Sequence, residues 1–134
     1  MILADSDVLI DFLRGKGPGA ERIQIELRTG RLSTTALNAF ELISGARTER
    51  EQESVRLLLQ ALHILSFDSA AAERAAGVRR ELESKGEAIG TADYLIAGAC
   101  LAHGATLLTR NRKHFERVPG LKLGIQSGST LSDH

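Results

Sequence analysis

IGTADYLIAGACLAH, residues 89–103, is the stretch of the chain that decides its fold. It places one acid, Asp93, at the head of an almost wholly apolar run, and no residue from Tyr94 to Ala102 carries a charge. A helix that is apolar around its whole circumference is normally buried. The stretch therefore predicts a central buried helix, whose leading carboxylate either caps the helix or is held at the edge of the core for chemistry.

Length and composition predict one ordinary globular domain. The chain has 134 residues, of which 43% are hydrophobic and 25% charged, so it can bury a substantial single core. We expect this domain over residues 1–125 and a polar tail over residues 126–134. The formal net charge is zero, which excludes bulk electrostatic attraction to nucleic acid or to a membrane surface.

The N-terminus and the single cysteine favour a cytoplasmic protein. The opening residues, MILADSD, reach an acid at Asp5 and lack the basic start and long apolar segment of a secretory signal. No apolar run approaches the ~20 residues that span a bilayer. Cys100 lies inside the apolar stretch and has no second cysteine to pair with, which fits a packing role in a reducing compartment.

Short apolar runs alternate with helical patterns along the chain. The runs lie at residues 2–4, 32–34, 63–67, 105–109 and 121–123. Such alternation implies parallel pairing through right-handed crossovers, and hence an α/β fold: a three-layer α/β/α sandwich with a central, mainly parallel sheet. Ligands bind such sheets beyond the carboxyl ends of the strands, where Asp5 and the turn at residues 109–111 would lie.

Three acids interrupt apolar sequence: Asp5 after ILA, Glu41 within ALNAFELI, and Asp93 before YLIAGACLA. Each also has a structural explanation. Asp5 can make an Asx turn or cap the first helix, Asn38 and Glu41 fit a capping box, and Asp93 suits a first helical turn. Together they indicate a site, because the predicted architecture places Asp5 on the ligand-binding edge of the sheet and the other two acids on helices facing it.

Carboxylates gathered on one edge repel one another, which raises their pKa values. A divalent cation relieves this repulsion, and Mg²⁺ prefers hard oxygen ligands and keeps several waters. Such an ion lowers the pKa of a bound water and neutralises charge that develops on a phosphate. The acids therefore predict hydrolysis of a phosphodiester bond.

Other polar residues surround these acids. Ser6 is predicted to cap the first helix, and Asp7 is either a first-turn acid or part of the metal shell. The hydroxyls of Thr34 and Thr109 either orient an acid or cap strand ends. His114 is expected at the surface or facing a substrate.

The segments MILADSDVLIDFLRG, TTALNAFELISGA and IGTADYLIAGACLAHGATLLTRNRKHFERVPGL, in this order, resemble the PIN-domain ribonucleases, specifically VapC-type toxins of bacterial toxin–antitoxin pairs. The resemblance extends to about Leu123. It implies that Asp5, Glu41 and Asp93 bind Mg²⁺, with Mn²⁺ able to substitute. Asn111 falls where the family has an acid or an asparagine and is included among the catalytic residues, although its neutral amide leaves a second strongly held metal in doubt.

The resemblance also implies partners: an RNA substrate, a small VapB-like antitoxin that holds the enzyme inactive, and a second copy of the chain in a homodimer. The residues themselves offer one basic group, Arg110, Arg112, Lys113 and Arg117. This group suits contact with the RNA backbone, and a solvated helix face is the alternative.

Two other functions compete with the ribonuclease. Asp5-Ser6-Asp7 after an apolar run resembles the start of haloacid-dehalogenase-type phosphatases, in which Asp5 would be the nucleophile. That class needs a later lysine and paired acids at a strand end, whereas Arg110 and Asn111 follow the late strand. The third function is a non-catalytic RNA-binding module on a PIN-like fold, but such a module gains nothing from crowding three acids.

Overall fold

A computed structural model describes residues 1–125 of the chain, so the predicted tail at residues 126–134 lies outside the described residues. The strands are β1 (Ile2–Ala4), β2 (Leu32–Thr35), β3 (His63–Leu65), β4 (Thr106–Leu108) and β5 (Lys122–Leu123). The helices are α1 (Ser6–Leu13), α2 (Gly19–Arg28), α3 (Ala36–Gly45), α4 (Glu49–Gln60), α5 (Ser69–Ser84), α6 (Thr91–His103) and α7 (Arg112–Phe115). The boundary of the domain at residue 125 stays a prediction.

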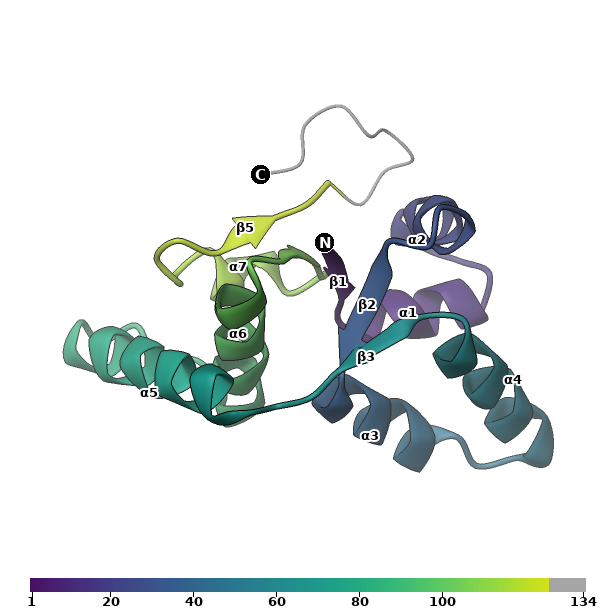
Figure 1. Cartoon of the computed structure of the whole chain (residues 1–134), viewed down its shortest axis with the longest axis horizontal. Coiled ribbons are helices and arrows are strands. Elements are labelled where there is room, and N and C mark those ends of the chain that lie inside the picture. Colours follow the sequence, from purple (N-terminus) through teal and green to yellow (C-terminus); the bar gives the residue numbers. More distant parts are fainter. Residues whose placement is uncertain (126–134) are drawn as a thin grey trace.

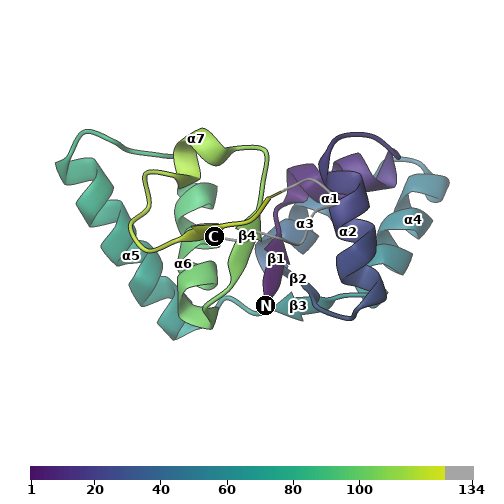
Figure 2. The same ribbon diagram turned by 90° about the horizontal axis from the view of Figure 1, so that it is seen from above.

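The five strands form one sheet in the order β3-β2-β1-β4-β5, and every neighbouring pair is parallel. Strand β1 lies at its centre, with Ile2 opposite Leu32 of β2 and Leu3 opposite Leu107 of β4. Helices α1 to α4 lie on one side of the sheet and α5 to α7 on the other (Figure 1; Figure 2). The predicted three-layer α/β/α sandwich is confirmed.

The side chains of β1 alternate between two hydrophobic cores. Leu3 joins the core beneath α5, α6 and α7, whereas Ile2 and Ala4 join the core beneath α1 to α4. Successive residues of a strand point to opposite faces of the sheet, so burial on both faces requires an uninterrupted apolar run. The three residues of β1 are accordingly all buried.

Helix α6 is the central buried helix that residues 89–103 predict. It lies against α5 at a close approach: a Cβ on Gly98 would stand 2.6 Å from the carbonyl oxygen of Ala71 and 2.6 Å from the Cβ of Ala75. Gly104 ends the helix in the left-handed region with φ 64°. Cys100 is fully buried in the core, and burial raises the pKa of its thiol to about 12, so its predicted packing role is confirmed.

The sequence offers both Asp5 and Ser6 as the cap of α1, and the structure decides between them. Asp5, and not Ser6, is the N-cap of α1, with its carboxylate accepting the Ser6 backbone N–H at 2.8 Å. The capping box of α3 joins Thr35 to Asn38, and the predicted pair of Asn38 with Glu41 is wrong. The physical reason is that α3 begins directly after β2, which makes Asn38 its third residue. Glu41 is therefore released from capping and stands one turn further along the helix.

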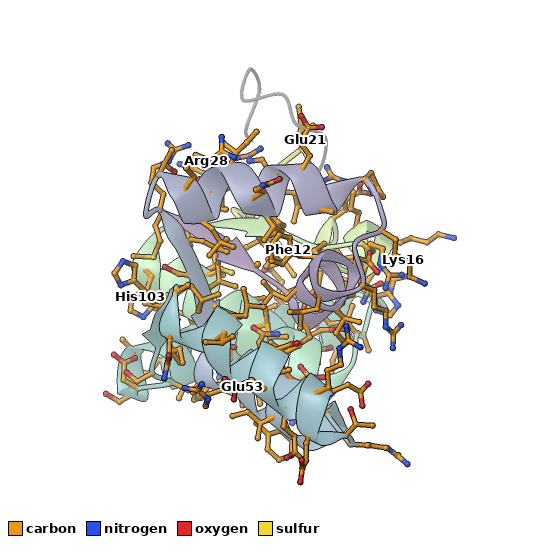
Figure 3. The ribbon with its side chains drawn as sticks, turned by 90° about the vertical axis from the view of Figure 1, so that its right-hand side faces the viewer. Phe12, Lys16, Glu21, Arg28, Glu53 and His103 are labelled. Carbon is orange, nitrogen blue, oxygen red and sulfur yellow. The ribbon has the colours of Figure 1, made fainter. Side chains whose placement is uncertain are left out.

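Helix α2 buries an ion pair that its hydrophobic pattern does not reveal. Arg22 and Glu26 are both fully buried, with 3.2 Å between Arg22 Nε and Glu26 Oε1, and Arg31 donates to the same oxygen at 2.8 Å. Figure 3 shows Phe12 on the core side of α2 and Glu21 on its outer side. A buried carboxylate is stabilised only when it is paired, which explains why two arginines converge on Glu26.

Among residues 1–125, no helix combines the length and the apolar character that a membrane-spanning segment needs.

Candidate active site

The candidate site lies where the strand order reverses, at the carboxyl ends of β1 and β4. Asp5 follows β1, and its backbone N–H donates to the carbonyl of Leu108 at 2.9 Å. A crevice forms at this point in open parallel sheets. The groove of about 390 Å³ found here is lined by Asp5, Ser6, Asp7, Ile10, Arg14, Glu41, Ala92, Asp93, Ile96, Arg110 and Asn111. The structure thus brings together all four predicted catalytic residues.

Asp5 is the most deeply held acid of the site, with 8% of its surface exposed. Its Oδ1 accepts hydrogen bonds from the Ser6 backbone N–H at 2.8 Å and from the Asn38 side-chain amide at 3.0 Å. Its Oδ2 accepts one from the Thr109 hydroxyl at 2.8 Å. Donors from α1, from α3 and from the turn after β4 therefore fix the carboxylate, and of the two roles that the sequence left open for Thr109, this hydrogen bond favours the orientation of an acid.

Glu41 and Asp93 reach the groove from helices on opposite sides of the sheet. Glu41 Oε1 accepts a hydrogen bond from the Ser6 hydroxyl at 2.9 Å, and that hydroxyl accepts one from the Asn38 amide at 2.9 Å. Asp93, in the first turn of α6, has its Oδ2 3.1 Å from Nδ1 of His114. Both acids are therefore held by side chains of the protein itself.

Asp7 belongs to the same cluster. Its Oδ2 accepts a hydrogen bond from the Arg110 backbone N–H at 3.1 Å, and the Thr109 hydroxyl, whose one hydrogen is shared with the closer Asp5, lies 3.3 Å from the same oxygen. Its Oδ1 is buried and lacks a hydrogen-bond partner among the described residues. A buried carboxylate oxygen without a partner is costly, so the site has an unsatisfied acceptor that a cation or its bound water would satisfy.

The pKa of Asp5 is raised from 3.8 to about 6. Burial of the carboxyl group is the largest cause, followed by the negative charge of Asp7, with Glu41 adding a smaller share. The hydrogen bonds from Thr109 and Ser6 oppose the rise. The predicted effect of crowded carboxylates is therefore present, although loss of water contributes more than repulsion does.

The donor set fits a hard divalent cation. All the acids of the groove offer oxygen, one of these oxygens lacks a partner, and burial together with the negative charge of Asp7 raises the pKa of Asp5. Within residues 1–125, no three His, Cys, Asp or Glu side chains are gathered as closely as direct ligation by all of them requires. Glu41 is hydrogen-bonded to Ser6, and Asp93 to His114. To bind Mg²⁺, these two acids would rotate toward the ion or contact it through the waters that Mg²⁺ retains.

Three of the four predicted RNA-binding cations also hold other parts of the chain. The guanidinium of Arg110 lies 2.8 Å from Asp11 Oδ2, that of Arg112 donates to the Gly124 carbonyl at 2.8 Å, and that of Arg117 donates to the Ala88 carbonyl at 3.1 Å. Lys113 is exposed, and Arg110 also lines the groove. Contact of these four residues with RNA stays a prediction.

Sequence reasoning missed three residues of the site as functional. Ser6 and Asn38 were interpreted as caps, and no local signal shows that they meet, because they are 32 positions apart. Arg14 lines the groove and did carry a signal. Its spacing from Asp7 and Ile10 is that of one helix face.

Comparison with known proteins identifies the class to which this fold and site belong. The family model described as PIN domain matches residues 2–121. The tRNA(fMet)-specific endonuclease VapC of Salmonella typhimurium is 31% identical over 125 residues, covering 90% of this chain and 94% of that protein. Ribonuclease VapC10 of Mycobacterium tuberculosis is 34% identical over 122 residues, covering 91% of each chain.

Solved structures agree with these relatives. The VapBC2 complex of Rickettsia felis, bound to a promoter DNA fragment, contains a chain with TM-score 0.81 and 27% identity, covering 90% of this chain and 96% of that one. A DNA-bound VapBC complex from Salmonella typhimurium gives TM-score 0.80 and 30% identity, with the same coverage. The chain therefore belongs to the PIN-domain family, as a VapC-type ribonuclease toxin of a VapBC toxin–antitoxin system.

Proposed function

We propose that the chain is a Mg²⁺-dependent endoribonuclease in which Asp5, Glu41 and Asp93 hold the ion, and that Mn²⁺ can replace it. The observation that carries the proposal is the buried, hydrogen-bonded Asp5 at the strand reversal, with its pKa raised to about 6 beside Asp7. An enzyme that leaves such a charge uncompensated in its free state has a use for a cation there. The more general conclusion, that the chain is a nuclease of a typically metal-dependent family, follows from the comparisons with known proteins.

When bound, the ion would lower the pKa of a water molecule and neutralise charge on the phosphate that is attacked. The chain's own residues do the positioning. Ser6, Asn38 and Thr109 fix the carboxylate of Asp5, so that it does not have to be ordered during the reaction. Arg14 and Arg110 line the same groove and offer positive charge to the RNA backbone.

Asp93→Asn tests this function. The variant should fold as the wild type does but should lose Mg²⁺- or Mn²⁺-dependent cleavage of RNA, because the amide carries no charge for the ion. Cleavage at the wild-type rate would contradict the assignment. If neither the wild type nor Asp93→Asn cleaved RNA, that result would favour the non-catalytic RNA-binding module.

The phosphatase alternative receives no support from the site. Both oxygens of Asp5 accept hydrogen bonds and only 8% of its surface is exposed, which leaves little access for a nucleophilic attack by this residue. Membership of the PIN-domain family supports the nuclease.

A structured RNA, with transfer RNA as the first candidate, is the proposed substrate. The Salmonella relative, at 31% identity, is described as a tRNA(fMet)-specific endonuclease. Arg110, Arg112, Lys113 and Arg117 are the proposed contacts to the RNA backbone, and such contacts bind without reading sequence. An RNA substrate of this kind supports a cytoplasmic site of action.

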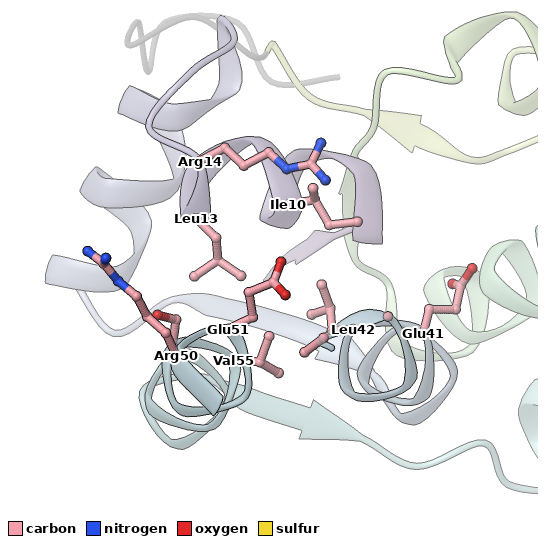
Figure 4. A pocket seen from close by; sticks show the side chains of 11 residues that line it. Ile10, Leu13, Arg14, Glu41, Leu42, Arg50, Glu51 and Val55 are labelled. Carbon is pink, nitrogen blue, oxygen red and sulfur yellow. The ribbon is translucent and has the colours of Figure 1, made fainter. Parts of the chain in front are cut away.

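A VapB-like antitoxin is the proposed inhibitor, and its proposed docking surface is an apolar groove beside the acids. The groove lies between α1, α3 and α4, with apolar walls formed by Ile10, Leu13, Leu42, Ala46 and Val55. Figure 4 shows Ile10 and Leu13 facing Leu42 and Val55, with the carboxylate of Glu51 between them and Arg14 along α1. Arg14 and Glu41 line both this groove and the acidic one, so a segment bound here would end at the catalytic acids.

Ala46→Arg is expected to weaken inhibition by a co-expressed VapB-like antitoxin by at least about tenfold, because the long cation fills the apolar groove. Cleavage by the isolated enzyme should be retained. Inhibition is measured by titrating the purified antitoxin into a cleavage assay. Ala76→Arg, the same change on the exposed face of α5, is the control and should be inhibited normally. Equal inhibition of both variants would place the antitoxin elsewhere.

We also propose the homodimer that the resemblance implies. Helix α3 exposes 68% of Phe40 and 59% of Ile43, and Ile64 on the edge strand β3 is 46% exposed. In the proposed dimer, a second copy of the chain packs against these apolar side chains and buries them.

A further inference from the structure

His114 makes a contact that the proposed chemistry does not use. Its Nδ1 lies 3.1 Å from Oδ2 of Asp93, one of the proposed metal-binding acids. The side chain of Asp93 is 19% exposed and that of His114 is 42% exposed. The contact joins α7 to the first turn of α6 across 21 positions of sequence, so the fold must be formed before it exists.

The chemistry of the contact determines which ring nitrogen carries hydrogen. An ionised carboxylate only accepts hydrogen bonds, so Nδ1 of His114 must donate to Asp93. Nδ1 also lies 3.0 Å from the side-chain amide of Asn111. When Nδ1 of His114 carries hydrogen, the side chain of Asn111 must present its amide oxygen, and not its NH₂ group, to Nδ1. With that orientation, the Nδ1–H group of His114 is shared by Asp93 and Asn111.

The imidazole ring of His114 is held in place by the contacts of its neighbours in α7 and in the turn before it. Phe115, the next residue, is fully buried in the core, and the backbone N–H of Phe115 donates to the Asn111 carbonyl at 3.3 Å. The Asn111 backbone N–H donates to the Thr109 hydroxyl at 3.0 Å, and that hydroxyl binds Asp5 at 2.8 Å. A continuous series of contacts therefore runs from Asp5 to His114, which in turn holds Asp93.

We propose that His114 is a positioning residue that fixes the carboxylate of Asp93 through Nδ1–H, leaving its other oxygen directed at the groove. This inference rests on the proposed function, because Asp93 must bind the ion for its orientation to matter. Hydrogen bonds to ligating carboxylates are a general means of fixing a metal site, and their loss typically costs about 10–100-fold in metal affinity or activity.

The competing role is contact of His114 with RNA through its other nitrogen, Nε2. Two substitutions separate these roles. An asparagine side chain places its amide nitrogen near the position of Nδ1, whereas a glutamine side chain reaches the region of Nε2. Positioning of Asp93 therefore predicts that His114→Asn works and His114→Gln fails. A role in RNA contact predicts the reverse.

The experiment compares His114→Ala, His114→Asn and His114→Gln with the wild type. Mn²⁺ affinity is measured on each protein without RNA, by electron paramagnetic resonance of the free ion. Cleavage is measured as separate kcat and KM values. We expect His114→Ala and His114→Gln to lose about 10–100-fold in Mn²⁺ affinity and in kcat at low metal, with KM little changed, and His114→Asn to restore both.

Three outcomes would overturn the inference: unchanged Mn²⁺ affinity in His114→Ala, rescue by glutamine and not by asparagine, or a change confined to KM. Failure of the proposed function is a different result. In that case Asp93→Asn itself would bind Mn²⁺ as the wild type does. Melting temperatures of all variants show whether Phe115 still anchors α7.

Discussion

Asp5→Asn is expected to abolish cleavage while making the metal-free protein more stable. Cleavage should fall by on the order of 10²–10³-fold or more, the usual loss when a preorganised electrostatic group of an active site is removed. At the same time, the free energy of unfolding at pH 7 should rise by about 3 kcal/mol, because a pKa raised by about two units costs that much when the group is ionised. The asparagine side chain of this variant keeps an oxygen that can accept the hydrogen bonds from Ser6 and Asn38.

The sign of the stability change follows from the pKa. Asp5 titrates at about 6 in the folded protein against 3.8 as the ordinary value, so the folded state binds the proton more tightly. Its contribution to stability is therefore fully present below about pH 4 and is lost as the pH rises through about 6. The amide does not titrate. The two proteins should thus be equally stable near pH 4 and differ most above pH 6.5.

Denaturant unfolding of both proteins between pH 4 and pH 8, with a chelator present, measures this difference. Addition of Mg²⁺ should stabilise the wild type at neutral pH but not Asp5→Asn, since a ligand that binds only the folded state raises its stability. An Asp5→Asn variant that is less stable than the wild type at every pH would show that the hydrogen bonds of Asp5 outweigh its charge.

Gly98→Ala should destabilise the protein, although it adds only one methyl group to α6. The new Cβ would lie 2.6 Å from the Ala71 carbonyl oxygen and 2.7 Å from the Ala75 backbone nitrogen, and backbone atoms cannot move aside as a flexible side chain can. Helices α5 and α6 would have to separate. Overpacking of this kind costs about 1–3 kcal/mol or more, which outweighs the gain of up to ~1 kcal/mol in helix propensity.

Gly77→Ala is the matched control. Gly77 lies on α5, and a Cβ there would meet no atom within 4 Å. The control should gain roughly 0.5–1 kcal/mol from helix propensity alone. Urea unfolding of both variants checks the pair, and a Gly98→Ala protein as stable as the Gly77→Ala protein would contradict the close packing of α5 on α6.

The sequence predicted the fold well because its signals are local. The apolar run at residues 94–102 indicates a buried helix on its own, and the uninterrupted strand Ile2–Ala4 indicates burial on both faces of a sheet. The buried pair of Arg22 and Glu26 was not predictable in this way. Charged residues on a helix normally face solvent, and only the packing of α2 shows that these two do not.

The site was predictable in its acids but not in its hydrogen bonds. Asp5, Glu41 and Asp93 stand out because each interrupts apolar sequence. Ser6 and His114 do not stand out, since their partners are Glu41, 35 positions away, and Asp93, 21 positions away. Contacts of this kind depend on how the helices sit on the sheet, which no short pattern records.

The chemistry of the RNA ends that the enzyme produces tests the central claim most directly. Water activated at a metal site attacks phosphorus directly, so the products should carry a phosphate on one end and a hydroxyl on the other, without a 2′,3′-cyclic phosphate. Wild-type enzyme with Mg²⁺ should yield such ends, and a chelator or Asp93→Asn should remove them. Ends that carry a 2′,3′-cyclic phosphate would show attack by the RNA's own 2′-hydroxyl and would contradict metal-activated water, whereas cleavage that persists in the chelator would contradict a metal-dependent site.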